Sequence, residues 1–248
     1  MALLDNFSWG DPRRPSTLGA LAAAVTGCCD GAAAHAAPFV SGKDSLNNEY
    51  VGADGERHSV PPTLVITAIA HVPDAGQCVT TDLAEPGNVL LLVGRTLHEF
   101  AGSHFDLVHG APADIGTVPT PDAGAPDRYR RLHAAMRDGL IRSCHDLSEG
   151  GLAVALAEMA IAGRLGATID RLPTDDATTS LFAESTGRFV LEVAPDDVAR
   201  VTGTLDQPVV VLGHVTGAAE LRLPGCRTLS VDELLHAWQR TDPSMAMP

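Results

Sequence analysis

The chain has 248 residues, of which 45% are hydrophobic and 4% aromatic, and its formal net charge at pH 7 is −14. This length and apolar content suffice for one large or two small domains with a packed core. The negative charge and the lack of a Lys/Arg stripe argue against broad nucleic-acid binding, so any phosphate ligand has to be held locally by backbone N–H groups, helix ends or a bridging cation.

The cysteines and the apolar segments indicate the compartment. The cysteines form no CxxC pair and are odd in number, which disfavours a disulfide framework, so we expect them to be buried as small hydrophobic residues. They are Cys28, Cys29, Cys78, Cys144 and Cys226. No window approaches about 18 uninterrupted apolar residues, and the alanine-rich residues 18–37 lack a basic leader. The sequence therefore predicts a cytoplasmic protein with no membrane span or signal peptide.

The first part of the chain predicts a helix, a strand, a hairpin and a second strand, in that order. Residues 16–36 have the apolar spacing of a helix that begins after a proline. Residues 39–40 begin a strand, and residues 51–59 contain the turn residues of an exposed hairpin tip. The apolar run at residues 64–72 predicts a buried strand.

A polar connection rich in glycine and proline at residues 73–86 suggests a domain boundary. Beyond it, helices and strands alternate with hairpin-like stretches between them, which predicts an α+β or mixed α/β fold. The expected strands are residues 89–93, 140–144, 189–193 and 209–215, and the expected helices are residues 127–137, 151–162, 195–204 and 231–239.

The most informative segment is residues 38–50, where a short apolar run ends at a glycine that is followed at once by cationic, anionic, hydroxyl and amide groups. Gly42 lets the backbone approach a ligand closely, and Lys43 can neutralise phosphate. Asp44 can hold a divalent cation, and Ser45 can donate to a phosphate oxygen. The alternative is a solvated turn between strands. The number of such residues in a row favours a phosphate-binding loop.

A second candidate lies where the strand at residues 141–144 runs into His145-Asp146-Leu147-Ser148-Glu149-Gly150-Gly151 and a helix begins. Asp146 and Ser148 stand at a helix N-terminus, where free N–H groups and the dipole attract anions. Either side chain could instead cap the helix, and the local pattern does not separate capping from ligand contact. His145 alone indicates a core histidine, and we assign it no catalytic role.

Two further segments carry weaker local signals. Asp5 and Asn6 stand where a strand meets a Gly-Asp-Pro turn, which by itself indicates only a turn. Glu184 and Arg188 precede the strand at residues 189–193, and their helical spacing is typical of a surface ion pair.

Taken together, four segments resemble phosphoribosylformylglycinamidine synthase, the ATP-dependent amidotransferase of purine biosynthesis, in its second synthetase-like half. The segments read LLDNFSWGDP, PFVSGKDSLNNEY, CHDLSEGGLAVALAEMAIAG and LFAESTGRFVLEV, and they occur in the family's order over almost the whole chain. Aminoimidazole ribonucleotide synthetase and selenophosphate synthetase share the fold but not the long SGKDSLNNEY segment. The resemblance implies the α+β (mixed α/β) fold of the aminoimidazole ribonucleotide synthetase-like superfamily.

For the first loop, the resemblance implies that Asp5 and Gly42 contact ATP and that Ser45 contacts formylglycinamide ribonucleotide. The position after the glycine binds magnesium in the family, and many relatives carry asparagine there. In this chain it is Lys43, whose ammonium group cannot coordinate a cation. We therefore expect Lys43 to contact phosphate directly, with Asp44 as a metal candidate.

For the second candidate, the resemblance implies an auxiliary site. In larger family members the aspartate and serine that match Asp146 and Ser148 bind a second, non-catalytic nucleotide with its magnesium. Asp146 is therefore expected to contact both the nucleotide and the metal.

The implied reaction uses ATP to phosphorylate the amide oxygen of formylglycinamide ribonucleotide, which gives an iminophosphate that ammonia displaces. Positioning and charge neutralisation do most of such work. The ammonia would come from a separate glutaminase subunit, joined through a small bridging subunit, because none of the cysteines stands in a glutaminase context. No nucleic acid or membrane is expected as a partner.

The chain lacks the segments that carry the catalytic histidine in complete synthases, so the resemblance implies a C-terminal portion without a catalytic residue of its own. The missing N-terminal synthase half is then a required partner. The expected domains are a truncated N-terminal synthetase-like domain at residues 1–80, a C-terminal domain at residues 84–224, and a helix and tail at residues 225–248. The truncated domain should expose apolar surface and form oligomers. The alternative is a non-catalytic module that only binds nucleotide or dimerises.

Overall fold

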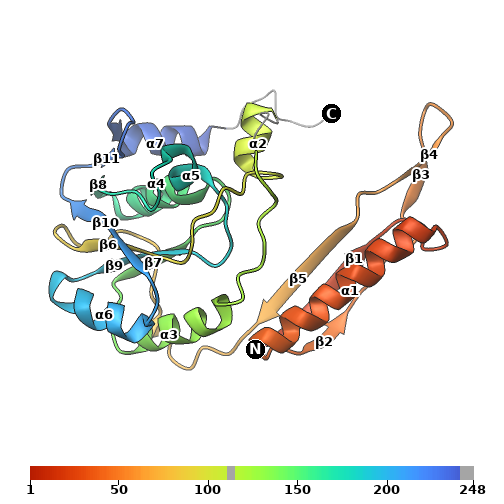
Figure 1. The fold of residues 1–248 in the computed structure, drawn as a ribbon, viewed down its shortest axis with the longest axis horizontal. Helices are drawn as coiled ribbons and strands as arrows, with labels where there is room; N and C mark the ends of the chain where they lie inside the picture. Colours follow the sequence, from red (N-terminus) through yellow and green to blue (C-terminus); the bar gives the residue numbers. More distant parts are fainter. Residues whose placement is uncertain (111–114, 241–248) are drawn as a thin grey trace. The chain divides into compact units, whose positions relative to one another are not determined.

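The chain forms two compact units, Met1–Ala75 and Gly76–Pro248, in a computed structural model that describes residues 1–110 and 115–240. The division falls inside the polar connection at residues 73–86. The first unit has its own sheet and one α-helix, and the second has its own sheet and several helices, as Figure 1 shows. The protein is therefore built from two separately packed parts.

The first unit consists of one three-stranded sheet, one long helix and one hairpin (Figure 1). The central strand β1 is parallel to β2 and antiparallel to β5, and α1 connects β1 to β2. The elements are β1 (Ala2–Ser8), α1 (Pro15–His35), β2 (Phe39–Gly42), β3 (Glu49–Val51), β4 (Arg57–Ser59) and β5 (Thr63–Ile69). The hairpin consists of β3 and β4, which are antiparallel.

Helix α1 begins and ends within one residue of its predicted bounds. Pro15 stands in the first turn, where the missing N–H is not needed, and Ala36 ends the helix in the left-handed conformation at φ 50°. No residue of α1 is buried, and Leu18 and Val25 are 52% and 46% exposed. The helix is therefore apolar without being covered inside its own unit.

By length and composition α1 could cross a membrane, since it has 21 residues and a mean hydropathy of 1.3. This differs from the expectation that no segment approaches a membrane span, which counted only uninterrupted apolar residues. Core helices of soluble proteins pass the same test, so the finding describes the composition of α1 and assigns no location.

Strand β5 is an exposed edge strand, and the prediction that its apolar run is buried was wrong. Val65, Ile66 and Ile69 are 55%, 45% and 58% exposed. The reason is that, within residues 1–75, neither face of β5 is fully covered by another element; the strand also stands at the edge of its sheet and pairs only with β1. An apolar run of this kind is typical of a strand that another element covers.

The second unit is a seven-stranded sheet with helices on both faces (Figure 1). The strand order is β12-β11-β8-β10-β6-β9-β7, and every neighbouring pair is antiparallel except β11 with β8. The strands are β6 (Val89–Val93), β7 (Ser143–Asp146), β8 (Gly166–Ile169), β9 (Phe189–Val193), β10 (Val209–Thr216), β11 (Glu220–Arg222) and β12 (Leu229–Ser230). The helices are α2 (His104–His109), α3 (Ala125–Arg137), α4 (Gly151–Gly163), α5 (Ala177–Phe182), α6 (Val198–Leu205) and α7 (Val231–Gln239), with short 3-10 turns η1 (Ala75–Gln77) and η2 (Pro195–Asp197).

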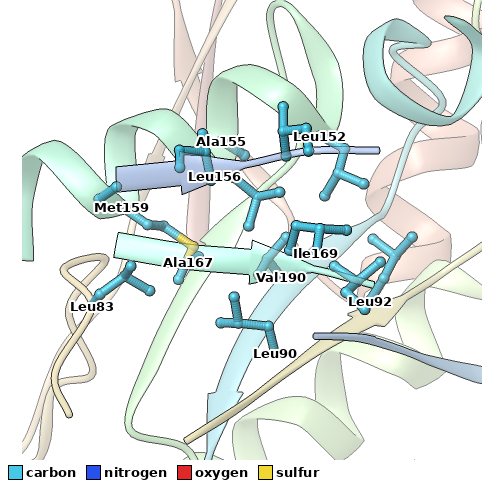
Figure 2. Packing of buried hydrophobic residues seen from close by; sticks show 14 of the residues in the cluster. Leu83, Leu90, Leu92, Leu152, Ala155, Leu156, Met159, Ala167, Ile169 and Val190 are labelled. Carbon is cyan, nitrogen blue, oxygen red and sulfur yellow. The ribbon is translucent and has the colours of Figure 1, made fainter. Parts of the chain in front are cut away.

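Strand β6 contributes to a separate core on each of its faces. Leu90 and Leu92 pack with α4 in the cluster that Figure 2 shows. Leu91 and Val93 pack with residues of α3 and α6 in a second cluster. Because successive side chains of a strand point to opposite faces, this uninterrupted apolar run places buried side chains on both faces of β6. The predicted α+β (mixed α/β) class is confirmed, with helices on both faces of a mainly antiparallel sheet.

The shortest elements were missed by sequence reasoning, and one strand was displaced. Helices α2 and α5 and strands β8, β11 and β12 have two to six residues, too few to show a period. The strand expected at residues 140–144 is β7, which begins at Ser143; Leu140 and Ile141 precede it and pack in the second core.

The cysteines are not buried as a group, so that expectation was also wrong. Cys29, Cys78 and Cys226 are exposed, and Cys28 and Cys144 are partly buried. Desolvation by burial, with a smaller contribution from the charge of Asp146, raises the pKa of the Cys144 thiol to about 12. This thiol therefore stays protonated and unreactive at neutral pH.

Glu192 is a buried charged residue that connects β9 to the segment that precedes β6. Its carboxylate is fully buried in β9 and accepts hydrogen bonds from the backbone N–H groups of Ala84 (2.8 Å) and Glu85 (2.9 Å). It also accepts from Asn88 Nδ2 at 2.7 Å and Ser143 Oγ at 3.1 Å. Both carboxylate oxygens are therefore satisfied, as burial of a polar group requires.

We expect Glu192→Gln to destabilise the second unit by about 3 kcal/mol, which corresponds to a fall in Tm of roughly 6–12 °C. The amide turns one acceptor into a donor that faces other donors, although its size is unchanged. Differential scanning calorimetry measures the change. Glu85→Gln, at an exposed side chain, is the matched control and should stay within about 0.5 kcal/mol of the parent. Equal Tm values for the two variants would contradict this role of Glu192.

Candidate functional site

The first candidate site begins with a contact between Asp5 on β1 and Gly42 at the end of β2. The two residues are partners in the parallel pairing of these strands, and Lys43 N–H donates to the carbonyl oxygen of Asp5 at 3.0 Å. A Cβ placed on Gly42 would lie 2.3 Å from Asp5 Oδ1. The carboxylate of Asp5 therefore rests directly on the α-carbon of Gly42, which only glycine permits.

Lys43 and Ser45 lie on the other face of the sheet from Asp5. Ser45 N–H donates to Phe7 O at 2.7 Å, and Ser45 pairs with Ser8, three residues beyond Asp5. Because side chains alternate along a strand, an offset of three residues places Ser45 on the opposite face. Lys43 Nζ donates to Ser45 Oγ, so these two side chains act as a pair. The structure thus brings Asp5 to Gly42 and Lys43 to Ser45, and it separates the two pairs.

The polar residues at the end of the loop are used to hold it in place. Asn48 Nδ2 donates to Ser8 Oγ at 2.7 Å and to Ser45 O at 3.3 Å. The side chain of Glu49 is only 2% exposed and forms ion pairs with Arg14 and Arg57. Sequence reasoning counted both residues toward a ligand site, but these long-range partners could not be read from their spacing.

At the second candidate site, neither Asp146 nor Ser148 caps α4, so the capping alternative was wrong. The N-cap is Gly150 at φ 76°, without a side-chain cap. Its N–H donates instead to Glu184 Oε1 at 2.8 Å, and the same oxygen accepts from His104 N–H, at the start of α2, at 2.9 Å. A carboxylate at two helix N-termini is electrostatically favourable. Sequence reasoning missed this role because Glu184 lies far along the chain from both helices.

Arg188 does not form the surface ion pair with Glu184 that their spacing suggested. It is 1% exposed and donates from Nε to Ser185 O at 3.0 Å, from Nη1 to Thr96 Oγ1 at 3.0 Å, and from Nη2 to Ala183 O. Desolvation lowers its pKa to about 10. The buried guanidinium group therefore stabilises the turn that precedes β9 through its hydrogen bonds.

Asp146 and Ser148 are both exposed at the end of β7. Asp146 Oδ1 lies 3.4 Å from Nδ1 of His145, whose Nε2 lies 2.9 Å from Glu158 Oε2. His145 is therefore hydrogen-bonded to Glu158 through Nε2, whereas its buried Nδ1 has no hydrogen-bond partner among the described residues, so it is not a fully satisfied core histidine. The carboxylate of Asp146 keeps most of its surface open to a ligand.

The described residues contain no group of three or more His, Cys, Asp or Glu side chains that could hold a metal ion. Mg²⁺ is usually bound by one or two carboxylates together with phosphate oxygens and water. Single carboxylates such as Asp146 or Asp44 fit that donor set only when a phosphate ligand completes it. The first candidate site, with Asp5, Gly42, Lys43 and Ser45, belongs to the first unit. Asp146 and Ser148 belong to the second unit.

The chain is similar to known proteins over nearly its whole length. The family model of the AIR synthase related protein C-terminal domain matches residues 85–225. The phosphoribosylformylglycinamidine synthase subunit PurL of Chelativorans sp. (strain BNC1) is 34% identical over 253 residues, which cover 96% of this chain and 32% of that protein. The chain therefore spans about a third of the length of this curated relative.

Two solved structures share the fold. Thermotoga maritima PurL complexed with FGAR matches with a TM-score of 0.68 and 18% identity, covering 94% of this chain and 39% of that one. The same protein complexed with ATP matches with a TM-score of 0.65 and 16% identity, covering 94% and 37%. The resemblance inferred from the four sequence segments is confirmed.

We expect Gly42→Ala to destabilise the first unit by about 1–3 kcal/mol, because the added methyl group must displace the Asp5 carboxylate. Gly19→Ala is the matched control, since Gly19 lies inside α1 and a methyl group added there would meet no atom within 4 Å. This control should stabilise the unit by about 0.5–1 kcal/mol. Urea unfolding followed by the fluorescence of the buried Trp9 measures both. The same sign for both variants would contradict the contact.

Proposed function

Because the chain belongs to the family of AIR synthase related proteins, whose C-terminal domain occupies residues 85–225, we propose that it is a component of a phosphoribosylformylglycinamidine synthase. In this reaction ATP phosphorylates the amide oxygen of formylglycinamide ribonucleotide, and ammonia then displaces the phosphate. The described residues include none that we assign to proton transfer. The chain would bind and orient the ligands, and it would be inactive alone.

The observation that carries this proposal is the contact between Asp5 and Gly42 in the SGKDSLNNEY segment. A carboxylate accepts hydrogen bonds and repels phosphate, so Asp5 would receive hydroxyl or amino groups of ATP. Gly42 would let the nucleotide approach the backbone. On the opposite face, Ser45 would donate to the ribonucleotide substrate, and Lys43 would neutralise a phosphate group.

The auxiliary nucleotide site would use Asp146 and Ser148. The N–H of Gly150 already donates to Glu184, so a second nucleotide would depend on these two side chains. Magnesium would enter with the phosphates, whose charge it neutralises, and Asp146 would supply one carboxylate ligand. Asp44 would be the corresponding carboxylate at the first loop.

The first unit also offers a surface for the N-terminal part of a synthase. An apolar groove of about 480 Å³ lies between α1 and the sheet. Its lining includes Leu3, Cys28, Phe39, Leu64, Ile66 and Ala68. We propose the N-terminal part of a full-length synthase as its occupant, because this chain covers only 32% of the curated relative. A separate glutaminase, a bridging subunit and a cytoplasmic location complete the proposal.

A non-catalytic module that binds nucleotide or dimerises is the second candidate. The exposed edge strand β5 favours it, since an uncharged and uncovered edge readily pairs with another strand. The two candidates differ in whether an added N-terminal half changes ATP binding.

We expect isothermal titration with ATP and magnesium to detect binding to the chain combined with the N-terminal two thirds of Chelativorans PurL. Asp5→Asn should weaken that binding at least tenfold, about 1.4 kcal/mol, because the acceptor loses its charge. Asp30→Asn, at an exposed position of α1, makes the same charge change and should have no effect. Absence of binding with and without the added half would rule out the ligase role. Equal affinities for the two variants would remove Asp5 from the site.

We expect sedimentation velocity to show self-association of the isolated chain, because of its apolar groove, and a 1:1 complex after the N-terminal half is added. Ile66→Glu places a charge in the groove and should abolish both associations. Val51→Glu, at a similarly exposed residue of the hairpin outside the groove, should leave them unchanged. A well-behaved monomer that does not bind the added half would overturn the assigned occupant.

A further inference from the structure

Two arginine side chains from different elements meet at one buried carboxylate in the first unit. Arg14 precedes α1, and its Nη2 lies 3.2 Å from Glu49 Oε1 and 3.4 Å from Glu49 Oε2. Arg57, on β4, places Nη1 at 3.4 Å from the same Oε2. The two guanidinium groups are therefore close enough for a single oxyanion to contact both.

The charges at this place do not cancel, and the remaining charge is positive. The buried carboxylate of Glu49 can neutralise only one of its two arginines. The neighbouring Arg13 is already matched, since its Nε and Nη2 donate to both oxygens of Asp11 at 2.8–3.1 Å. This pairing lowers the pKa of Asp11 to about 2. One uncompensated positive charge remains in a chain whose formal net charge is −14.

Each guanidinium group also keeps unused donors that reach solvent. The side chains of Arg14 and Arg57 are 46% and 59% exposed, whereas Glu49 is 2% exposed. Each arginine uses only one terminal nitrogen toward Glu49, and a guanidinium group has five N–H donors. The buried carboxylate thus fixes one edge of each group and leaves the rest free.

No acidic residue in the first turn of α1 opposes an anion here. Arg14 is the N-cap residue, without a side-chain cap, and the first turn contains no carboxylate. The helix end therefore adds to the positive potential of the arginines and does not reduce it.

We propose that Arg14 and Arg57 form a binding site for a phosphate monoester. Paired guanidinium forks match the tetrahedral oxygens of phosphate better than ammonium groups do, and charge-assisted hydrogen bonds of this kind are the strong ones. Glu49 is the positioning residue that holds the two forks together. This inference goes beyond the proposed function and does not depend on it.

Phosphorus NMR titration with ribose 5-phosphate at low ionic strength tests the site, with inorganic phosphate as a second arm and unphosphorylated ribose as the blank. We expect binding of ribose 5-phosphate, weakened at least tenfold by Arg57→Gln or Arg14→Gln. Arg57→Lys keeps the charge without the fork and should weaken it about threefold. Arg13→Gln is the matched control and should change the affinity less than twofold, because Asp11 already occupies that guanidinium. Circular dichroism establishes that each variant is folded.

Equal weakening by Arg13→Gln and Arg57→Gln would overturn the proposal, because it would reduce the site to a diffuse charge effect. Absence of any response to ribose 5-phosphate would overturn it as well. Binding of inorganic phosphate with no response to the ester would overturn the monoester assignment. Lys43→Gln separates this site from the first loop, where Lys43 would neutralise a phosphate group, because this variant should leave ribose 5-phosphate binding intact. Failure of one site therefore does not imply failure of the other.

Discussion

The second unit depends on the burial of both faces of its central strands. Side chains alternate along β6, so Leu90 and Leu92 need a cover on one side while Leu91 and Val93 need one on the other. Helix α4 supplies the first cover, and α3 with α6 supplies the second. Within this apolar layer the charged Glu192 is tolerated because four donors surround its carboxylate. The placement of helices on both faces of the sheet follows from the need to cover these two sets of side chains.

The first unit lacks such a second cover. It contains the same kind of apolar run in β5 and an apolar helix, yet no residue of α1 is buried. Apolar sequence without burial is costly for an isolated unit, which is why the proposed function places another part of a synthase against this surface. The sheet nevertheless fixes Asp5 against Gly42 through strand pairing alone. The contact between Asp5 and Gly42 therefore follows from the pairing of β1 with β2, while Asn48 and Glu49 hold the end of the loop through their own partners.

Sequence reasoning found the long or strongly apolar elements and failed where the cause lay in distant contacts. The helix α1 and the strands β6 and β9 were predicted closely because their apolar patterns are continuous. The burial of β5 was wrong because an apolar run is the same whether or not its cover is present. The class was predicted from the alternation of helices and strands, and the family from short segments whose residue order is unusual, such as SGKDSLNNEY.

At the candidate sites, too, sequence reasoning found what local segments determine and missed what distant contacts determine. The pairing of Asp5 with Gly42 agrees with the roles that the resemblance implies, whereas the placement of Ser45 on the opposite face follows from strand register, which spacing does not give. The partner of the α4 N-terminus was missed because Glu184 comes from another part of the chain. The roles of the individual site residues remain predictions.

The shared oxygen of Glu184 has a mechanical consequence for the second unit. Because a single atom accepts from the first N–H groups of both α2 and α4, neither helix start can shift without straining or releasing the other. A ligand that draws Glu184 away from Gly150 would at the same moment loosen the anchorage of His104. The two helix starts therefore share one anchor, the Oε1 atom of Glu184.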